Sequence, residues 1–119
     1  MWIQLTRSFS FEAAHFLEWH PGRCRNLHGH HYSFEVTVGG ELTEQGVVVD
    51  FDDLAATVES CVLSEFDHRL LNELLANPTA ELIAAEIWHR LAPELPGLAR
   101  IRLYETPDCY VELGSARPE

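Results

Sequence analysis

The chain has 119 residues, 46% of them hydrophobic, and carries a formal net charge of −11 at pH 7. This length and composition fit a single globular domain over residues 1–119 whose core needs no disulfides to hold it together. The negative charge disfavours nucleic acid and anionic membranes as partners, although it does not exclude a small anionic substrate, and no apolar run is long enough to span a bilayer. We therefore expect a cytoplasmic protein with neither nucleic acid nor membrane as a partner.

The N-terminal stretch alternates between apolar and polar residues, which is typical of a strand with one solvent-facing side. From Ile3 to His15 the odd positions are mostly apolar and the even positions are polar. His15 falls in the apolar phase, so its imidazole points inward and needs a partner there. An isolated histidine of this kind is more often a hydrogen-bonded core residue than a ligand.

The nine positions from Cys24 onward hold one thiol and three imidazoles. If a strand begins at His28, then His28 and His30 point to one face of it and His31 points to the other. A turn between the first two strands would make them antiparallel and bring His15 beside this pair. Three imidazoles around one open position match the ligand count of a catalytic zinc. The sequence therefore predicts a divalent metal site.

Two helices are expected after the second strand. Asp50 or Asp52 can cap the first helix, whose apolar residues recur at helical spacing. A turn over 77–79 caps the second helix, which Pro93 ends.

A polar cluster of Asp67, His68 and Arg69 lies between the two helices, inside a hydrophobic segment. A carboxylate beside an imidazole can be a plain surface pair at a helix end. It can also be an oriented general acid or base, in which Asp67 fixes the tautomer or raises the basicity of His68. The residues alone leave both readings open.

A strand over 100–105 and a last strand over 109–113 complete the pattern. Glu105 falls in the apolar phase of its strand, and a buried carboxylate needs either a counter-charge or a ligand. Cys61 and Cys109 lie in apolar patterns, so we expect both in the core. The element order ββααββ, with a further short strand conceivable at 47–49, indicates an α+β fold. In it an antiparallel sheet carries two helices on one face.

Six motifs, in this order along nearly the whole chain, resemble the 6-pyruvoyl-tetrahydropterin synthase family. They are Phe11-Glu12-Ala13-Ala14-His15, the Cys-x-x-x-His-Gly-His-x-Tyr run over 24–32, Val49-Asp50-Phe51, Asp67-His68 with Leu71-Asn72, Asn77-Pro78-Thr79-Ala80-Glu81 and Glu105-Thr106-Pro107. The three-residue gap between Cys24 and His28 is similar to the bacterial branch that makes 6-carboxy-tetrahydropterin for queuosine biosynthesis.

The resemblance implies the tunnelling fold (T-fold), in which three subunits join their sheets into a barrel and two trimers stack as a hexamer. It therefore implies a homo-oligomer, with active sites between subunits. It also implies a Zn²⁺ cofactor held by His15, His28 and His30. The resemblance further implies that Cys24 is the base and that Asp67 and His68 are its relay partners. It implies that Glu105 anchors the pterin, and this residue is also described as part of the relay.

The implied activity is that of a lyase. It converts 7,8-dihydroneopterin triphosphate to 6-carboxy-5,6,7,8-tetrahydropterin, acetaldehyde and triphosphate. Two alternatives stay open: a 6-pyruvoyl-tetrahydropterin synthase, which eliminates triphosphate but keeps the side-chain carbons, and a zinc-binding module without catalysis. Two features depart from the family. His31 stands where Asn or Ser is more usual, and the absence of lysine leaves arginines or backbone amides to hold a triphosphate.

Overall fold

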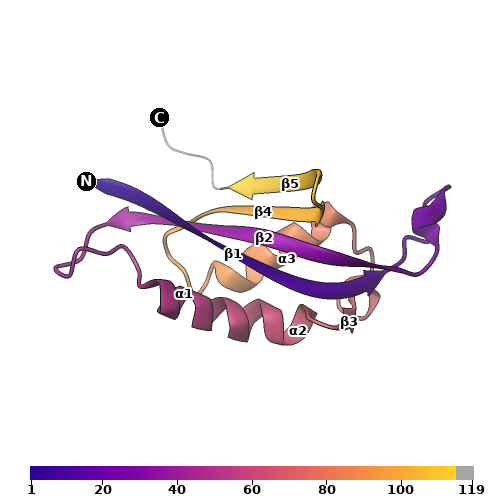
Figure 1. The fold of residues 1–119 in the computed structure, drawn as a ribbon, viewed down its shortest axis with the longest axis horizontal. Helices are drawn as coiled ribbons and strands as arrows, with labels where there is room; N and C mark the ends of the chain where they lie inside the picture. The colour runs from indigo at the N-terminus through magenta and orange to yellow at the C-terminus, as the bar shows by residue number, and fades with distance from the viewer. Residues whose placement is uncertain (115–119) are drawn as a thin grey trace.

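Within the described part of the chain, five strands form one sheet in the order β3-β1-β2-β4-β5, and the helices lie on one side of it (Figure 1). The structure, a computed structural model, describes residues 1–114. The strands are β1 (Trp2–His15), β2 (His28–Glu41), β3 (Arg69–Leu70), β4 (Leu98–Thr106) and β5 (Cys109–Gly114). The helices are α1 (Phe51–Val58), which continues through a π turn (Glu59–Leu63) into α2 (Ser64–Phe66), and α3 (Ala80–Leu91).

The sheet confirms the predicted order of strands and helices and adds a short parallel strand. β1 with β2, β2 with β4, and β4 with β5 are antiparallel, whereas β3 runs parallel to β1. The sheet is therefore mixed, because the chain leaving α2 passes along the free edge of β1 for two residues. The run 47–49 forms no strand; Val48 and Val49 instead pack against the core before α1 begins.

The core lies between the helices and the face of the sheet that carries the predicted apolar phase. Phe11, Tyr32 and Phe34 stack or meet edge to face on this side of β1 and β2. All three are buried, as are Leu54 of α1 and Ile83 of α3. The alternation of the strands and the spacing of the helices thus converge on one apolar layer.

The helix caps follow the predicted pattern. The Asp50 carboxylate accepts from the backbone N–H groups of Asp52 and Asp53, at 3.0 and 3.3 Å. The Thr79 hydroxyl accepts from the N–H of Leu82 at 3.2 Å. Each cap satisfies N–H groups that the first turn of a helix leaves without a partner, so both helices begin at defined residues.

One burial prediction is confirmed and another is wrong. Cys61 is partly buried against the core, as expected. Cys109 is exposed, because it is the first residue of β5, an edge strand, and lies beside the hairpin turn, where little of the chain covers it. Among the described residues, no helix has the length and apolar character needed to cross a membrane.

Candidate metal centre and its surroundings

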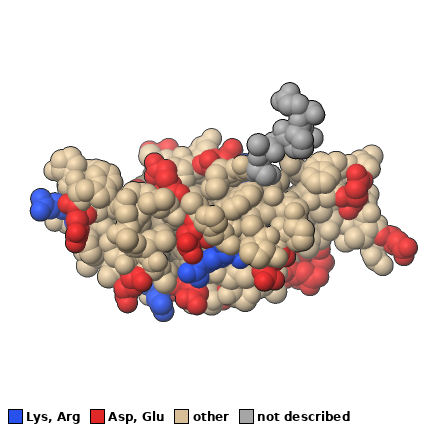
Figure 2. Space-filling model, turned by 180° about the vertical axis from the view of Figure 1, so that it is seen from behind, with Lys and Arg blue, Asp and Glu red and all other residues tan. Residues whose placement is uncertain are grey.

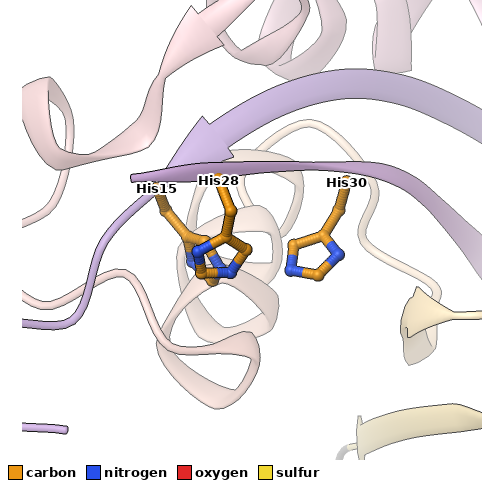
Figure 3. A group of neighbouring side chains, drawn as sticks. All are labelled: His15, His28 and His30. Carbon is orange, nitrogen blue, oxygen red and sulfur yellow. The ribbon is translucent and has the colours of Figure 1, made fainter. Parts of the chain in front are cut away.

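Three histidines meet at the end of the sheet where β1 stops and β2 starts. The antiparallel register places His15 opposite His28 and Ala13 opposite His30. One ring nitrogen of each histidine lies within 4.8 Å of the corresponding nitrogens of the other two. The three imidazoles hang from the same side of the strands (Figure 3). The prediction that His15 lies beside the other two histidines is confirmed.

The hydrogen bonds of two of these rings fix where their protons are. Nδ1 of His15 lies 2.8 Å from the carbonyl oxygen of Pro78, and Nδ1 of His28 lies 2.7 Å from that of Asn26. A carbonyl only accepts, so in the neutral rings both Nδ1 atoms carry hydrogen and both Nε2 atoms present lone pairs. Yet these two Nε2 atoms lie only 3.0 Å apart. Two lone pairs at this separation repel unless a proton or a metal cation lies between them.

The third ring has a nitrogen that the protein leaves unused. Nε2 of His30 is buried and has no hydrogen-bond partner among the described residues. Burial lowers the pKa of His30, a shift that Glu105 opposes and that His15 and His28 reinforce. The ring is therefore neutral at pH 7 and offers a lone pair. Three inward-facing imidazole nitrogens, two of them oriented by carbonyls, form a donor set that fits a zinc ion.

Glu105 borders the histidine cluster. Its carboxylate oxygens lie 3.9 Å from Nε2 of His15 and 3.8 Å from Nε2 of His30, and its side chain is 28% exposed. Burial, and to a smaller degree Glu105, raises the pKa of Tyr32, so this phenol stays neutral beside His15. The sequence required a counter-charge or a ligand for this carboxylate, and the structure places it against the histidines.

Asp67 and His68 form a pair on an exposed turn at the edge of β1. The Asp67 carboxylate lies 3.1 Å from Nδ1 of His68 and accepts from the N–H of Glu12 at 2.9 Å. The backbone N–H of His68 donates to the carbonyl of Glu12, and His68 has a left-handed backbone with φ 59°. The hydrogen bond from Glu12 is the main reason that the pKa of Asp67 is lowered, and His68 adds to it. The pair is thus fixed to β1 although both side chains are exposed.

Cys24 lies in a 3₁₀ turn (Arg23–Arg25) within the loop between β1 and β2. This loop extends beyond the sheet at the end opposite the N-terminus (Figure 1). Cys24 is half-buried, and its carbonyl accepts from the N–H of Leu17 at 2.9 Å. It is not among the residues lining the two hollows described next. A single chain therefore places Glu105 beside the three histidines, whereas the Cys24 side chain lies outside the hollows next to them.

Two open hollows share Gly29, His30 and His31 in their linings. One, of about 610 Å³, lies between the ends of β2 and β4 and includes Glu105 and Tyr104. The other, of about 550 Å³, lies across β3, β1 and β2 and includes His68 and Arg69. Acidic side chains are spread over the face drawn in Figure 2, with basic ones at few places. An anionic ligand in this acidic chain therefore depends on local cations such as Arg69.

The structure also shows site contacts that the sequence did not reveal. The rings of His15 and His28 are oriented by backbone carbonyls, which any residue type can supply, so no side-chain signal marks Pro78 or Asn26. His31 points away from the cluster, as its strand phase predicted, and its Nδ1 pairs with the carboxylate of Glu12.

The fold and the site together define the class: a T-fold domain with a three-histidine cluster at one end of its sheet. The chain belongs to the 6-pyruvoyl tetrahydropterin synthase family, whose model matches residues 4–116. The family predicted from the sequence motifs is thereby confirmed, and so is the fold.

Three known proteins illustrate the similarity. The chain is 41% identical over 114 residues to a 6-carboxy-5,6,7,8-tetrahydropterin synthase of Synechocystis sp., covering 89% of this chain and 88% of the relative. It is 44% identical over 110 residues to a dihydroneopterin monophosphate aldolase of Pyrococcus furiosus, covering 87% and 90%. The solved structure of 6-pyruvoyl tetrahydropterin synthase from Caenorhabditis elegans superposes with a TM-score of 0.87 at 26% identity, covering 98% and 97%. Because these relatives carry three different activity names, family membership alone does not decide the reaction.

Proposed function

We propose that this protein is a zinc-dependent lyase. It converts 7,8-dihydroneopterin triphosphate and water to 6-carboxy-5,6,7,8-tetrahydropterin, acetaldehyde and triphosphate, a reaction of queuosine biosynthesis. The observation that carries the proposal is the cluster of three imidazoles with Glu105 beside it. The 41% identity to the Synechocystis synthase supports this reaction within the family. We further propose a single domain over 1–119 and a cytoplasmic location.

His15, His28 and His30 would hold the zinc through their Nε2 atoms, since carbonyl groups occupy Nδ1 of two of them. When bound, zinc supplies Lewis-acid stabilisation of the negative charge that develops on the substrate side chain. Glu105 accepts hydrogen bonds from the amino and imino groups of the pterin ring and so fixes the ring next to the metal. Its position at the border of the cluster and of the 610 Å³ hollow supports this role.

Proton transfers fall to Cys24 and to the Asp67–His68 pair. Cys24 acts as the base that removes a proton from the side-chain carbon, and His68 exchanges protons on the opposite side. The 3.1 Å contact between Asp67 and Nδ1 of His68 fixes the imidazole so that its Nε2 faces outward. Cys24 lines neither of the two hollows beside the histidines, so we propose that the active sites form between subunits of a trimer or hexamer.

A second reaction has support of its own. The Pyrococcus furiosus relative, at 44% identity, is named a dihydroneopterin monophosphate aldolase. An aldolase also breaks a carbon–carbon bond of the pterin side chain, but its aldehyde fragment keeps the phosphate. The histidine cluster suits both reactions, because each one develops negative charge next to a hydroxyl-bearing carbon.

One assay separates the candidates. The zinc-loaded protein is incubated with 7,8-dihydroneopterin triphosphate and, separately, with the monophosphate, and the aldehydes and released phosphates are identified. Acetaldehyde together with free triphosphate supports the proposed lyase. Triphosphate without acetaldehyde indicates the pyruvoyl-forming reaction, and a phosphorylated aldehyde indicates the aldolase. If the protein binds zinc but neither binds nor converts either pterin, the non-catalytic zinc-binding module is the remaining candidate.

A further inference from the structure

We infer that Asn72 is a positioning residue of the metal centre, acting through His15. This inference rests on the zinc-binding part of the proposed function. The mechanism uses Asp67 and His68 of its sequence motif but gives Asn72 no role. Asn72 lies 56 residues along the chain from Phe16, the residue that it binds.

The side chain of Asn72 binds both backbone groups of Phe16. Its Oδ1 accepts from the N–H of Phe16 at 3.0 Å, and its Nδ2 donates to the carbonyl of Phe16 at 2.9 Å. β1 ends at His15, so Phe16 is the first residue beyond the sheet. The amide therefore takes the place of a neighbouring strand, which would offer one acceptor and one donor to the same residue.

The same segment of the chain also holds the ring of His15. Asn72 lies in the 3₁₀ turn Leu71–Glu73, and Pro78, whose carbonyl accepts from Nδ1 of His15, lies six residues further on. The backbone next to His15 and the far side of its ring are thus both fixed from residues 72–78. His15 is the last residue of its strand and pairs with His28 on one side. The direction of its Nε2 therefore depends on these two restraints, together with the contact of its Nδ1 with the Tyr32 hydroxyl at 3.3 Å.

Removing one restraint should weaken the centre more than it disturbs the fold. Without the Asn72 amide, two polar groups of Phe16 lose their partners and the end of β1 can change direction. A small displacement of His15 then spoils the match between its Nε2 and the nitrogens of His28 and His30. Loss of an outer partner of a metal ligand typically costs ~10–100-fold in metal affinity.

The experiment measures Zn²⁺ affinity by competition with a chromophoric chelator for the full-length wild type, Asn72→Ala and Asn72→Asp. Visible absorption of the Co²⁺-substituted proteins reports coordination geometry independently of activity. Asn77→Ala is the matched control, because Asn77 lies in the same segment as Asn72. Its side chain accepts a 2.8 Å hydrogen bond from the exposed Trp19 and does not bind Phe16 or His15. Asn72→Asp keeps the side-chain volume and one acceptor, so it tests the donor if the alanine variant folds poorly.

The expected result is a loss of ~10–100-fold in zinc affinity for Asn72→Ala, an altered Co²⁺ spectrum, and wild-type behaviour for Asn77→Ala. Asn72→Asp should also bind more weakly, because its carboxylate faces the carbonyl of Phe16. Lower thermal stability with unchanged zinc affinity and an unchanged Co²⁺ spectrum would overturn the inference and leave the proposed function standing. A wild type that binds no zinc would overturn both.

Discussion

The metal centre and the reactive side chains around it are built in opposite ways. The three histidines stand on β1 and β2, two paired strands of 14 residues each. Cys24 and the Asp67–His68 pair stand on short exposed turns, one of them with a left-handed residue. Two paired strands of this length make many backbone hydrogen bonds, so their register is strongly fixed. A short turn is held by only a few hydrogen bonds. One chain can therefore supply the complete set of metal ligands by itself. The positions of the proton-transfer groups depend instead on the contacts that their turns make, including contacts with other subunits.

Removal of a ligand should have the largest effect. His28→Ala deletes one of three imidazoles, so zinc affinity should fall by more than ~100-fold, beyond the usual cost of losing an outer partner, and turnover should be lost. Zinc content by mass spectrometry and acetaldehyde release measure the two effects. His31→Ala is the matched control for zinc content, because this neighbouring histidine faces away from the cluster and pairs with Glu12. Full zinc occupancy in His28→Ala would show that the cluster is not the metal site.

Removal of the Cys24 thiol should impair turnover without impairing zinc binding, and so distinguish the turns from the metal centre. Cys24→Ala should lower kcat by ~10²–10⁴-fold, the usual contribution of a general base, with zinc content unchanged. Cys109→Ala, an exposed thiol on the edge strand β5 that lines neither hollow, should keep wild-type activity. Both variants are assayed for acetaldehyde after zinc loading. Unimpaired turnover by Cys24→Ala would remove this residue from the mechanism.

Mixing variants tests whether subunits share the reactive groups. If Cys24 and His68 of one site come from different chains, an equal mixture of Cys24→Ala and His68→Ala subunits regains activity in about a quarter of its sites. The mixture is dissociated, reassembled and assayed for acetaldehyde beside each variant alone. If the mixture is no more active than its parents, each chain supplies both groups to its own site.

The same contrast explains how far the sequence could predict the molecule. Alternating residues predicted β1 and β2, and antiparallel pairing then required His15 to meet the other two histidines. Glu105 was also predictable, because a charged residue in an apolar phase needs a partner. These features follow from side-chain type and period, which a sequence displays directly.

Other features leave no such signal. β3 has two residues, too few to show a period, and its pairing depends on where the chain passes after α2. The phase of Cys109 indicates a face of the strand but not whether anything covers that face at a sheet edge. The carbonyl of Pro78 orients His15 through an atom that every residue possesses. Such contacts depend on tertiary arrangement, so only coordinates reveal them.

The smallest expected effect concerns the pH dependence of stability at the Asp67 turn. In the folded state the hydrogen bond from the N–H of Glu12, with a smaller contribution from His68, holds the pKa of Asp67 below its usual value. The unfolded chain therefore binds a proton more readily than the folded one. The stabilisation is complete above the unfolded pKa of about 4 and is lost as pH falls through the lowered folded pKa.

Asp67→Asn removes the ionisation but keeps an acceptor for Glu12, so it isolates the contribution of the charge. The urea midpoint of the variant should lie below that of the wild type at pH 7, and the two should converge as the pH falls below about 4. Glu44→Gln, in the exposed turn after β2, serves as the control for losing one negative charge from an acidic chain. A wild-type advantage that is equal at pH 7 and pH 3 would mean that this turn is held by geometry alone. The Asp67 carboxylate would then only orient His68, in the same way that the pairing of β1 and β2 only orients the three histidines.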